Sequence, residues 1–296
     1  MVNGIVLVDK PEGVTSHDVV GALRRLFSTR KVGHAGTLDP MATGVLVLGI
    51  NAATRMLGHL TLSTKAYEAV IRIGAESTTD DREGVLSSVH DTDWISDERI
   101  AQVCSNYRGG INQVPSSVSA IKVSGRRAHE IVRTGGEVTL DAREVTIDSF
   151  VINSIQRSGP WTDVAITVHC SAGTYIRALA RDIGRDLGVG GHLTQLRRTA
   201  VGPFHVDSCV SLPNLLDSPD PGSYVTPMGV IAERVWPCVT VDQATREKVA
   251  HGQRLTSTTV PEESVFGVLG ADHELLAIAS NLDSRMKYKT VFVGIS

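Results

Sequence analysis

Asp39 combines a reactive side chain with an unusual setting in the sequence. Between positions 19 and 67 it is the only acidic residue, and the same stretch carries six cations. It lies in a run of small residues, Gly33–Gly44, that leads directly into the apolar run Val45–Ile50. Loops rich in Gly and Pro let the backbone approach a ligand closely. A single carboxylate in a basic setting suits an enzyme that acts on a polyanion and needs one acid.

Asp39 also has a simpler interpretation. It precedes Pro40, and Asp before Pro is a common way to begin a turn. An unpaired carboxylate beside a buried strand would be costly, so the residue needs either a partner or a function. Its neighbours in the fold therefore decide between the two interpretations.

Three further segments carry polar groups where sites are often found. They are Lys65–Glu68, where a Tyr opens a strand, Cys170–Leu179, a strand followed by a small-residue turn and a helix start, and Leu196–Arg198. Arg177 falls in the first helical turn, where the helix dipole opposes a cation and favours an anion nearby. Asp39 is a candidate for that anion, because Arg–carboxylate pairs are strong.

Each of these side chains also has an ordinary structural role open to it. Tyr67 and Tyr175 could be half-buried core residues with a bonded hydroxyl. Arg177 could lie along the surface of its helix, and His34 could be a polar loop residue.

Taken together, the segments resemble the TruB family of tRNA pseudouridine-55 synthases. The resemblance runs from Gly4 to about Phe204, and several motifs occur in the family's order. The matching stretches are Asp9–Ser16, Gly33–Leu46, Lys65–Tyr67, Pro115–Lys122, Gly173–Arg177 and Leu196–Arg198.

The resemblance implies catalytic roles for three side chains. Asp39 corresponds to the catalytic aspartate, Tyr67 to the residue that stacks on the target base and is a candidate base, and Arg177 to the ion-pair partner of Asp39. The implied reaction isomerises uridine to pseudouridine at position 55 in the T-loop of tRNA, after the base leaves its stack.

It also implies substrate-binding positions. Tyr175 and Leu196 correspond to pocket residues around the uracil, and His34 to the side chain that fills the space left in the RNA. Lys10, with Pro11, corresponds to support beneath the site. An isomerisation requires no redox cofactor and no metal, and the sequence has no Gly-x-Gly-x-x-Gly, Walker or clustered Cys/His motif. The implied partner is the T-arm stem-loop of tRNA, bound by a monomer that needs no other protein.

Composition fits a globular protein with segregated charge. The chain has 296 residues, 42% hydrophobic content and a net charge of −3. Residues 99–129 and 187–206 carry cations and no acid, whereas residues 76–98 carry eight acids. The basic blocks could form one cationic face, or could each be ordinary solvated surface. Four scattered Cys, no signal-peptide pattern and no apolar run of about 20 residues predict a soluble, cytoplasmic protein.

Hydrophobic periodicity predicts an α+β fold around a mixed, largely antiparallel sheet flanked by helices. The family resemblance implies that this sheet is pseudouridine-synthase-like. Residues 163–170 alternate strictly, as in a sheet with one less buried face. Strands are also expected at 4–8, 45–50, 66–73 and 145–155, and helices from about 16, over 96–107, and after a cap at Thr174. The later runs 264–269, 275–279 and 290–293 suggest a small β-rich module. The tail also resembles a PUA-type RNA-binding module, with Ala250–Leu255 as its best signature. The resemblance implies a catalytic domain at 1–233 and a PUA-like RNA-binding domain at 234–296.

Other functions remain open from the sequence. Glycoside hydrolysis fits less well, because it usually needs two carboxylates flanking one bond. A non-catalytic RNA-binding protein or tRNA-folding chaperone on the same scaffold is the main alternative. A guide-RNA-dependent relative is a further option, although no long basic extension is present.

Overall fold

The computed structural model describes residues 2–117, 122–123, 126–127, 136, 139–253, 264–282 and 285–293. Within these ranges, a ten-stranded sheet runs through the first 211 residues in the order β12-β1-β3-β10-β4-β9-β8-β5, with β2 beside β3 and β11 beside β10. Its strands are β1 (Gly4–Lys10), β2 (Val32–His34), β3 (Thr43–Ile50), β4 (Lys65–Ile73), β5 (Gly109–Gln113), β8 (Arg143–Ser158), β9 (Trp161–Cys170), β10 (Gly191–Val201), β11 (Phe204–His205) and β12 (Val210–Ser211).

The sheet is mixed and largely antiparallel, which confirms the predicted fold class. Its parallel pairs are β1 with β12 and β3 with β10. A separate two-stranded sheet pairs β6 (Lys122–Val123) with β7 (Arg126–Arg127). The period of two predicted for residues 163–170 is confirmed, because Val164, Ile166 and Val168 face the core.

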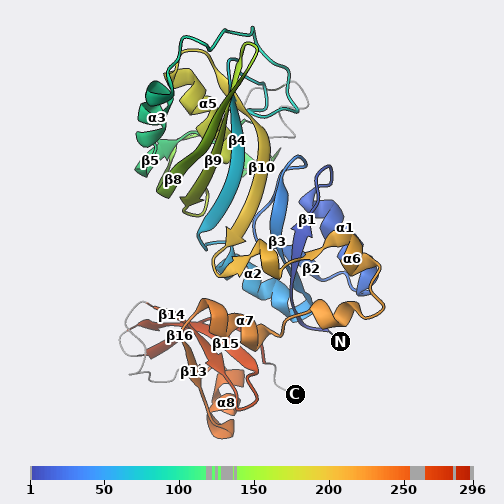
Figure 1. The fold of residues 1–296 in the computed structure, drawn as a ribbon. Helices are drawn as coiled ribbons and strands as arrows, with labels where there is room; N and C mark the ends of the chain where they lie inside the picture. Colours follow the sequence, from blue (N-terminus) through green and yellow to red (C-terminus); the bar gives the residue numbers. More distant parts are fainter. Residues whose placement is uncertain are drawn as a thin grey trace.

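The β3–β10 contact joins two halves of the large sheet (Figure 1). Only two residue pairs form it, Thr43 with Arg197 and Gly44 with Arg198. Gly44 has φ +102°, and a Cβ there would lie 2.1 Å from the Arg198 carbonyl oxygen. Glycine is therefore required for the two strands to approach this closely.

Helices cover one face of the whole sheet. α1 (Ser16–Leu26), α3 (Asp97–Ser105), α5 (Ile176–Asp186) and α6 (Leu212–Leu216) contribute to a single large core with the inward residues of the strands. Thr15 caps α1 in a capping box with Asp18, and Ser96 caps α3.

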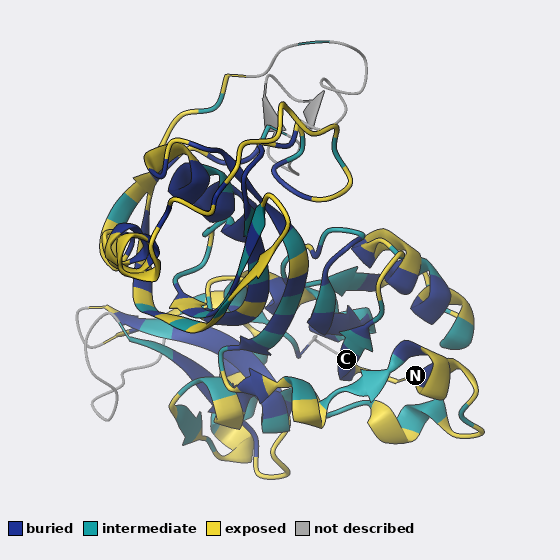
Figure 2. Cartoon of the chain, turned by 45° about the horizontal axis from the view of Figure 1, so that its top comes forward, coloured by how far each residue is buried: buried dark blue, intermediate teal, exposed yellow. Residues whose placement is uncertain are grey.

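The two halves differ on the opposite face. There β1 and β3 contribute Ile5, Leu7, Val45 and Val47 to a second core with η1 (Asn51–Met56) and α2 (Leu57–Leu60). The same face of β4, β9 and β8 is more exposed (Figure 2). Burial on both faces explains why residues 45–50 form a continuous apolar run, whereas residues 163–170 alternate.

The predicted cap of α5 is wrong by one residue. Tyr175 is the N-cap residue, and it makes no side-chain capping bond. The Thr174 hydroxyl instead donates to the carbonyl oxygen of Ser171 at 3.0 Å. It closes the turn after β9, so it is not available to the helix.

The C-terminal part forms a four-stranded sheet in the order β13-β14-β15-β16 (Figure 1). The large sheet leads to it through η2 (Val206–Ser208), η3 (Pro221–Tyr224) and α7 (Met228–Val235). Its elements are β13 (Cys238–Thr240), α8 (Gln243–Ala250), β14 (Val265–Leu269), β15 (Leu275–Leu282) and β16 (Arg285–Val291). The last strand was predicted too late, because the charged residues Arg285 and Lys287 disguise its alternation.

This small sheet has two differently packed faces. One face packs on Val249 of α8 in a core of its own. The other face adds Leu269, Leu275 and Ile278 to the second core, together with Ile5 and Leu7 of β1. The division at residue 233 therefore stays a prediction, and the two parts share buried apolar surface.

Some predicted features fall outside the described residues. Residues 118–121 of the Pro115–Lys122 motif do so, as do Arg254 and Leu255 of the C-terminal signature. In the described ranges, no helix is long and apolar enough to cross a membrane.

Candidate active site

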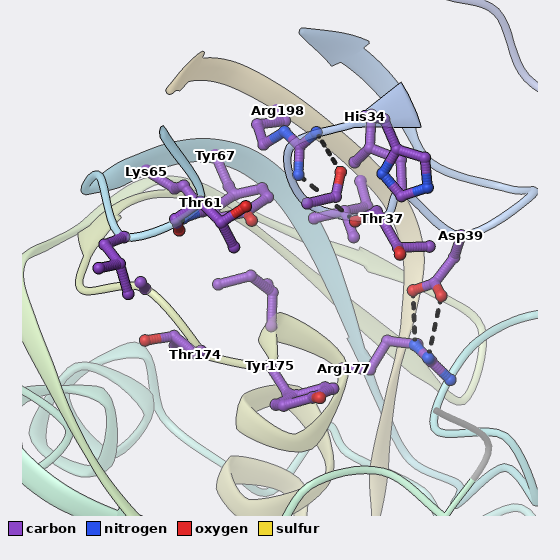
Figure 3. Close-up of a pocket in the computed structure, with 17 residues that line it drawn as sticks. His34, Thr37, Asp39, Thr61, Lys65, Tyr67, Thr174, Tyr175, Arg177 and Arg198 are labelled. Atoms are coloured by element: carbon purple, nitrogen blue, oxygen red, sulfur yellow. Dashed lines mark hydrogen bonds and ion pairs between the residues drawn. The ribbon is translucent and has the colours of Figure 1, made fainter. Parts of the chain in front are cut away.

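A cavity of about 590 Å3 opens beside the junction of the two sheet halves (Figure 3). Its walls come from the loop between β2 and β3, the turn before β4, the start of α5 and the strand β10. The residues that line it are His34, Gly36, Thr37, Leu38, Asp39, Thr61, Leu62, Lys65, Tyr67, Ala172, Gly173, Thr174, Tyr175, Ile176, Arg177, Leu196 and Arg198. Six of the seven predicted site residues lie in this one place.

Asp39 and Arg177 form a bidentate ion pair at one end of the cavity (Figure 3). Arg177 Nε donates to Asp39 Oδ2 at 2.9 Å, and Nη2 donates to Oδ1 at 3.1 Å. The Arg177 side chain is 5% exposed and that of Asp39 is 33% exposed. The buried fork fixes the orientation of a carboxylate that still reaches the cavity.

Arg177 is itself held from a second direction. Its Nη1 donates to the carbonyl oxygen of Thr79 at 2.8 Å and lies 3.4 Å from the carboxylate of Asp81. The Asp81 side chain is only 4% exposed. Arg177 therefore bridges two acids, one facing the cavity and one buried behind it.

The backbone after Asp39 rests on Lys10. The Lys10 ammonium is fully buried and donates to the carbonyl oxygens of Pro11, Val14 and Pro40 at 2.9, 2.7 and 3.2 Å. Burial lowers the pKa of Lys10 to about 8, against the opposing effect of nearby Asp39. Lys10 lies beneath the loop and does not line the cavity.

Tyr67 presents its ring to the cavity from β4. Burial raises the pKa of Tyr67, and the Arg198 guanidinium beside it opposes that shift. A phenol that is hard to ionise is poorly suited to act as a base at neutral pH. The raised pKa therefore favours stacking on a ligand over proton abstraction as the role of this ring.

Two further cations line the cavity, Lys65 at the end away from Asp39 and Arg198 against the loop that carries Asp39 (Figure 3). Lys65 Nζ donates to the carbonyl oxygens of Thr61 and Ser63 at 2.9 and 2.7 Å, and burial lowers the pKa of Lys65 to about 8. Arg198, 1% exposed, donates to the carbonyl oxygens of Val45 and Gly36 at 2.8 and 3.1 Å. Within the described part of the chain, neither cation has a carboxylate within 4.0 Å. The ion pairs nearby are made by Arg177 and Arg197.

The remaining predicted positions are distributed around the opening. His34 comes from the end of β2, Tyr175 from the residue before α5, and Leu196 from β10. Leu196 is almost fully buried, and its apolar side chain adjoins the cavity. These three residues provide one polar, one aromatic and one aliphatic surface for a ligand.

Two residues of the site were missed or undervalued in the sequence. Asp81 lies in the acid-rich stretch 76–98, where it resembles surface charge, and no local pattern distinguishes it. Lys65 could have been found, because positions two apart on a strand share a face and Tyr67 was already predicted to face the site.

The idea that basic blocks form one cationic face is wrong for residues 197–198. Arg197 is paired with the carboxylate of Asp9 at 2.7 Å, and Arg198 is buried. The Arg197 side chain is 38% exposed but its charge is paired, and Arg198 is buried, so the two residues add little free charge to the surface.

The cavity offers one acid to a reacting molecule. Asp39 is the only carboxylate among the described residues that line it. In the described residues no cluster of three or more His, Cys, Asp or Glu side chains is arranged to hold a metal ion. An enzyme of this construction would work through one oriented carboxylate, an aromatic surface and buried cations.

Comparison with known proteins shows the family of the chain. The family model described as TruB family pseudouridylate synthase (N terminal domain) matches residues 24–176, and that of the tRNA pseudouridylate synthase B C-terminal domain matches residues 177–221. A solved structure of a Cbf5–Nop10–Gar1 complex superimposes with a TM-score of 0.75, at 26% identity over 98% of this chain and 85% of that chain.

Two relatives extend the similarity along the whole chain. A tRNA pseudouridine synthase B of Corynebacterium diphtheriae is 50% identical over 296 residues, which cover 99% of this chain and 96% of that protein. One of Thermobifida fusca is 45% identical over 298 residues, covering 99% and 100%. The fold is that of a pseudouridine synthase, an isomerase. The chain belongs to the TruB family of pseudouridylate synthases, which confirms the resemblance read from its motifs.

Proposed function

We propose that this chain isomerises uridine to pseudouridine at position 55 in the T-loop of tRNA, with Asp39 as the catalytic carboxylate. The observation that carries the proposal is the bidentate Asp39–Arg177 pair at the edge of a cavity whose other wall is the ring of Tyr67. The relatives named tRNA pseudouridine synthase B support tRNA as the substrate.

The reaction needs little beyond these groups. The N1–C1′ bond breaks and a C5–C1′ bond forms, while C5 loses a proton and N1 gains one, so the product is an isomer of the substrate. One carboxylate can attack or assist at the reacting centre. The cavity requires no metal or organic cofactor for this chemistry, and we propose that none is used.

The target base has to leave the RNA stack to reach Asp39. Extrusion costs a few kcal/mol, and stacking on an aromatic ring returns about 1–3 kcal/mol per base. Tyr67 provides that ring inside the cavity. We assign Tyr175 and Leu196 to the walls around the uracil, His34 to the space vacated in the RNA, and Lys10 to the support of the Asp39 loop.

The finer partner assignments belong to the same proposal. The chain acts in the cytoplasm as a monomer on the T-arm stem-loop, and it needs no protein partner. The C-terminal sheet acts as a PUA-like module that binds RNA. Its second face is already used in the core shared with β1, so RNA would contact its exposed edges and loops.

The direct test uses purified protein and unmodified tRNA transcripts. Pseudouridine is mapped at single-nucleotide resolution after incubation with the protein alone. We expect one modified position, in the T-loop, and the same product with an isolated T-arm stem-loop. Pseudouridine only at another site would overturn the assignment to position 55.

The alternative of a tRNA-folding chaperone is separated by the same reactions. A chaperone without catalytic function would leave the uridine unchanged while altering the folding of the RNA. Activity after dialysis against a strong chelator, with the RNA fold held by monovalent salt, tests the absence of a metal. Loss of activity that only a transition metal restores would contradict that part of the proposal.

A further inference from the structure

Two polar side chains outside the cavity form hydrogen bonds with the backbone next to the Asp39–Arg177 ion pair. Each forms a reciprocal pair of hydrogen bonds, one donated and one accepted, with both backbone polar groups of a single residue. Ser16 bonds in this way to Leu38, which directly precedes Asp39. Gln113 bonds in the same way to Tyr175, which lies two residues before Arg177.

The contact of Ser16 is short and buried. Its hydroxyl donates to the Leu38 carbonyl oxygen at 2.9 Å and accepts from the Leu38 amide at 2.8 Å. Ser16 is 2% exposed and is the first residue of α1, whose capping bonds are made by Thr15. The Ser16 hydroxyl is therefore not needed to cap α1, and it bonds to the Asp39 loop instead.

The contact of Gln113 has the same form. Its Nε2 donates to the Tyr175 carbonyl oxygen at 3.0 Å, and its Oε1 accepts from the Tyr175 amide at 2.8 Å. Gln113 is the last residue of β5 and is 2% exposed. Tyr175 is the N-cap residue of α5 and makes no side-chain capping bond. The Gln113 side-chain amide bonds to both its N–H and its C=O, as the backbone of a paired strand would.

Both contacts join segments that are distant in the sequence. Ser16 and Leu38 are 22 residues apart, and Gln113 and Tyr175 are 62 residues apart. Neither Ser16 nor Gln113 lines the cavity. We infer that Ser16 and Gln113 are positioning residues, which set the register between Asp39 and Arg177 and the direction of Tyr175. The inference rests on the proposed catalytic role of Asp39.

Geometry of this kind matters most for the rate of the chemical step. A displacement of about 1 Å in a reacting group can cost roughly a hundredfold in rate. Overall tRNA affinity depends mainly on phosphate contacts elsewhere. A positioning residue should therefore alter the single-turnover rate constant and leave the dissociation constant nearly unchanged, whereas a residue needed only for folding should lower the melting temperature alone.

The sharpest variant is Gln113→Glu. An ionised carboxylate accepts from the Tyr175 amide and cannot donate to the Tyr175 carbonyl, whereas a protonated carboxyl can do both. Burial raises the pKa of a carboxyl group, so protonation is within reach of mild acid. We expect a single-turnover rate about tenfold below wild type near pH 8, with a deficit that shrinks toward pH 6. Gln113→Met, similar in shape and without these bonds, should show the deficit at both pH values.

Two matched controls lie on exposed positions away from the cavity. Gln156→Glu makes the same chemical change near the far end of β8, and Ser105→Ala matches Ser16→Ala on α3. We expect both controls to keep the wild-type rate at each pH. Ser16→Ala should slow the single-turnover step by about tenfold, with tRNA affinity within about twofold of wild type.

The outcomes distinguish the inference from the proposed function. A wild-type protein that forms no pseudouridine in tRNA would count against the proposed function and remove the basis of the inference with it. An active wild type whose Ser16 and Gln113 variants react at the wild-type rate would overturn the inference alone. A folded Gln113→Met variant, which lacks both bonds to Tyr175, that reacts at the wild-type rate would show that the Tyr175 hydrogen bonds do not set the rate.

Discussion

The two ends of the cavity handle buried charge in opposite ways. At one end Arg177 faces two carboxylates, with bonds of 2.9 and 3.1 Å to Asp39 and a 3.4 Å approach to Asp81. At the other end Lys65 donates to the backbone carbonyl oxygens of Thr61 and Ser63. The first arrangement balances charge with charge, and the second balances it with dipoles.

The difference separates two tasks. A paired carboxylate is held in one orientation with its charge stabilised, as a reacting group requires. A cation surrounded only by carbonyls stays electrically uncompensated, and its ionised form is less favoured, which is why burial lowers the pKa of Lys65 to about 8. The end with the Asp39–Arg177 ion pair (the paired end) therefore suits a reacting group. The end with Lys65 and its backbone carbonyls (the dipole end) stabilises the chain around it.

Loss of the charge on Asp39 should have the largest effect. Asp39→Asn keeps the shape of the side chain, so turnover should fall by at least about a thousandfold while tRNA binding stays within about tenfold. Single-turnover assays and filter binding measure the two quantities. Asp93→Asn, an exposed change of the same kind, should be neutral. Appreciable turnover by pure Asp39→Asn would remove the catalytic assignment.

Loss of Arg177 should have the next largest effect and should depend on pH. Arg177→Ala leaves Asp39 and Asp81 without their shared partner, so protonation of either acid no longer breaks an ion pair. Turnover should fall by about tenfold to a hundredfold, most strongly at low pH, with partial recovery as pH rises. Arg177→Lys should recover only part of the activity, because an ammonium cannot reproduce the planar fork.

Arg185 supplies the control for that series. It lies on the same helix, two turns later, and its side chain is 62% exposed. Arg185→Ala removes an equal charge from α5 without touching the cavity, and it should leave the pH profile unchanged. An Arg177→Ala profile parallel to wild type would mean that the Asp39–Arg177 pair does not govern the reaction.

Tyr67 tests whether the ring or the hydroxyl matters more. If stacking is its main role, Tyr67→Phe should keep more activity than Tyr67→Ala, which loses about 1–3 kcal/mol of base stacking. The raised pKa of Tyr67 argues against a tyrosinate base at neutral pH. Equal, complete loss in both variants would instead assign the chemistry to the hydroxyl group. Single-turnover rates at saturating tRNA make the comparison.

Local sequence signals located most of the paired end. The small-residue loop marks Asp39, the strand start marks Tyr67, and the helix start places Arg177 in its first turn. Asp81 was not predictable, because its contact with Arg177 joins segments that only the tertiary fold brings together. The motif quoted from positions 196–198 included Arg198, but nothing local shows that its guanidinium is buried against the backbone of β3.

The fold was predictable to a similar depth. Alternation and capping residues gave the type and approximate bounds of β1, β3, β4, β8, β9, α1, α3 and α5. They did not give β2, α2, β5 or β10. The core shared by β1, α7 and the C-terminal sheet was not foreseen, because each segment shows only its own apolar face. Residues such as Leu269 and Ile278 look alike in the sequence whether they pack within a module or against its neighbour.

The smallest expected effect concerns the unpaired cation at the dipole end. The folded pKa of Lys65 is about 8 and its ordinary value is 10.5. Below about pH 8 both folded and unfolded chains hold the proton, and the burial cost is fully present. Between these values the unfolded chain binds the proton and the folded chain does not, so rising pH favours folding. Lys65→Met should lack this gain, although it leaves the carbonyls of Thr61 and Ser63 without their donor.

The measurable quantity is the difference in unfolding free energy between wild type and Lys65→Met. As pH rises from about 7 to about 10, the unfolding free energy of wild type should increase relative to that of Lys65→Met, as measured by urea denaturation. Each unit of pKa difference contributes about 1.4 kcal/mol at most. The similarly shifted Lys10 is present in both proteins, so its contribution cancels in the difference. A difference that stays constant with pH would show that Lys65 keeps its ordinary affinity for the proton, as it would with a compensating anion nearby. That result would remove the contrast between the two ends of the cavity.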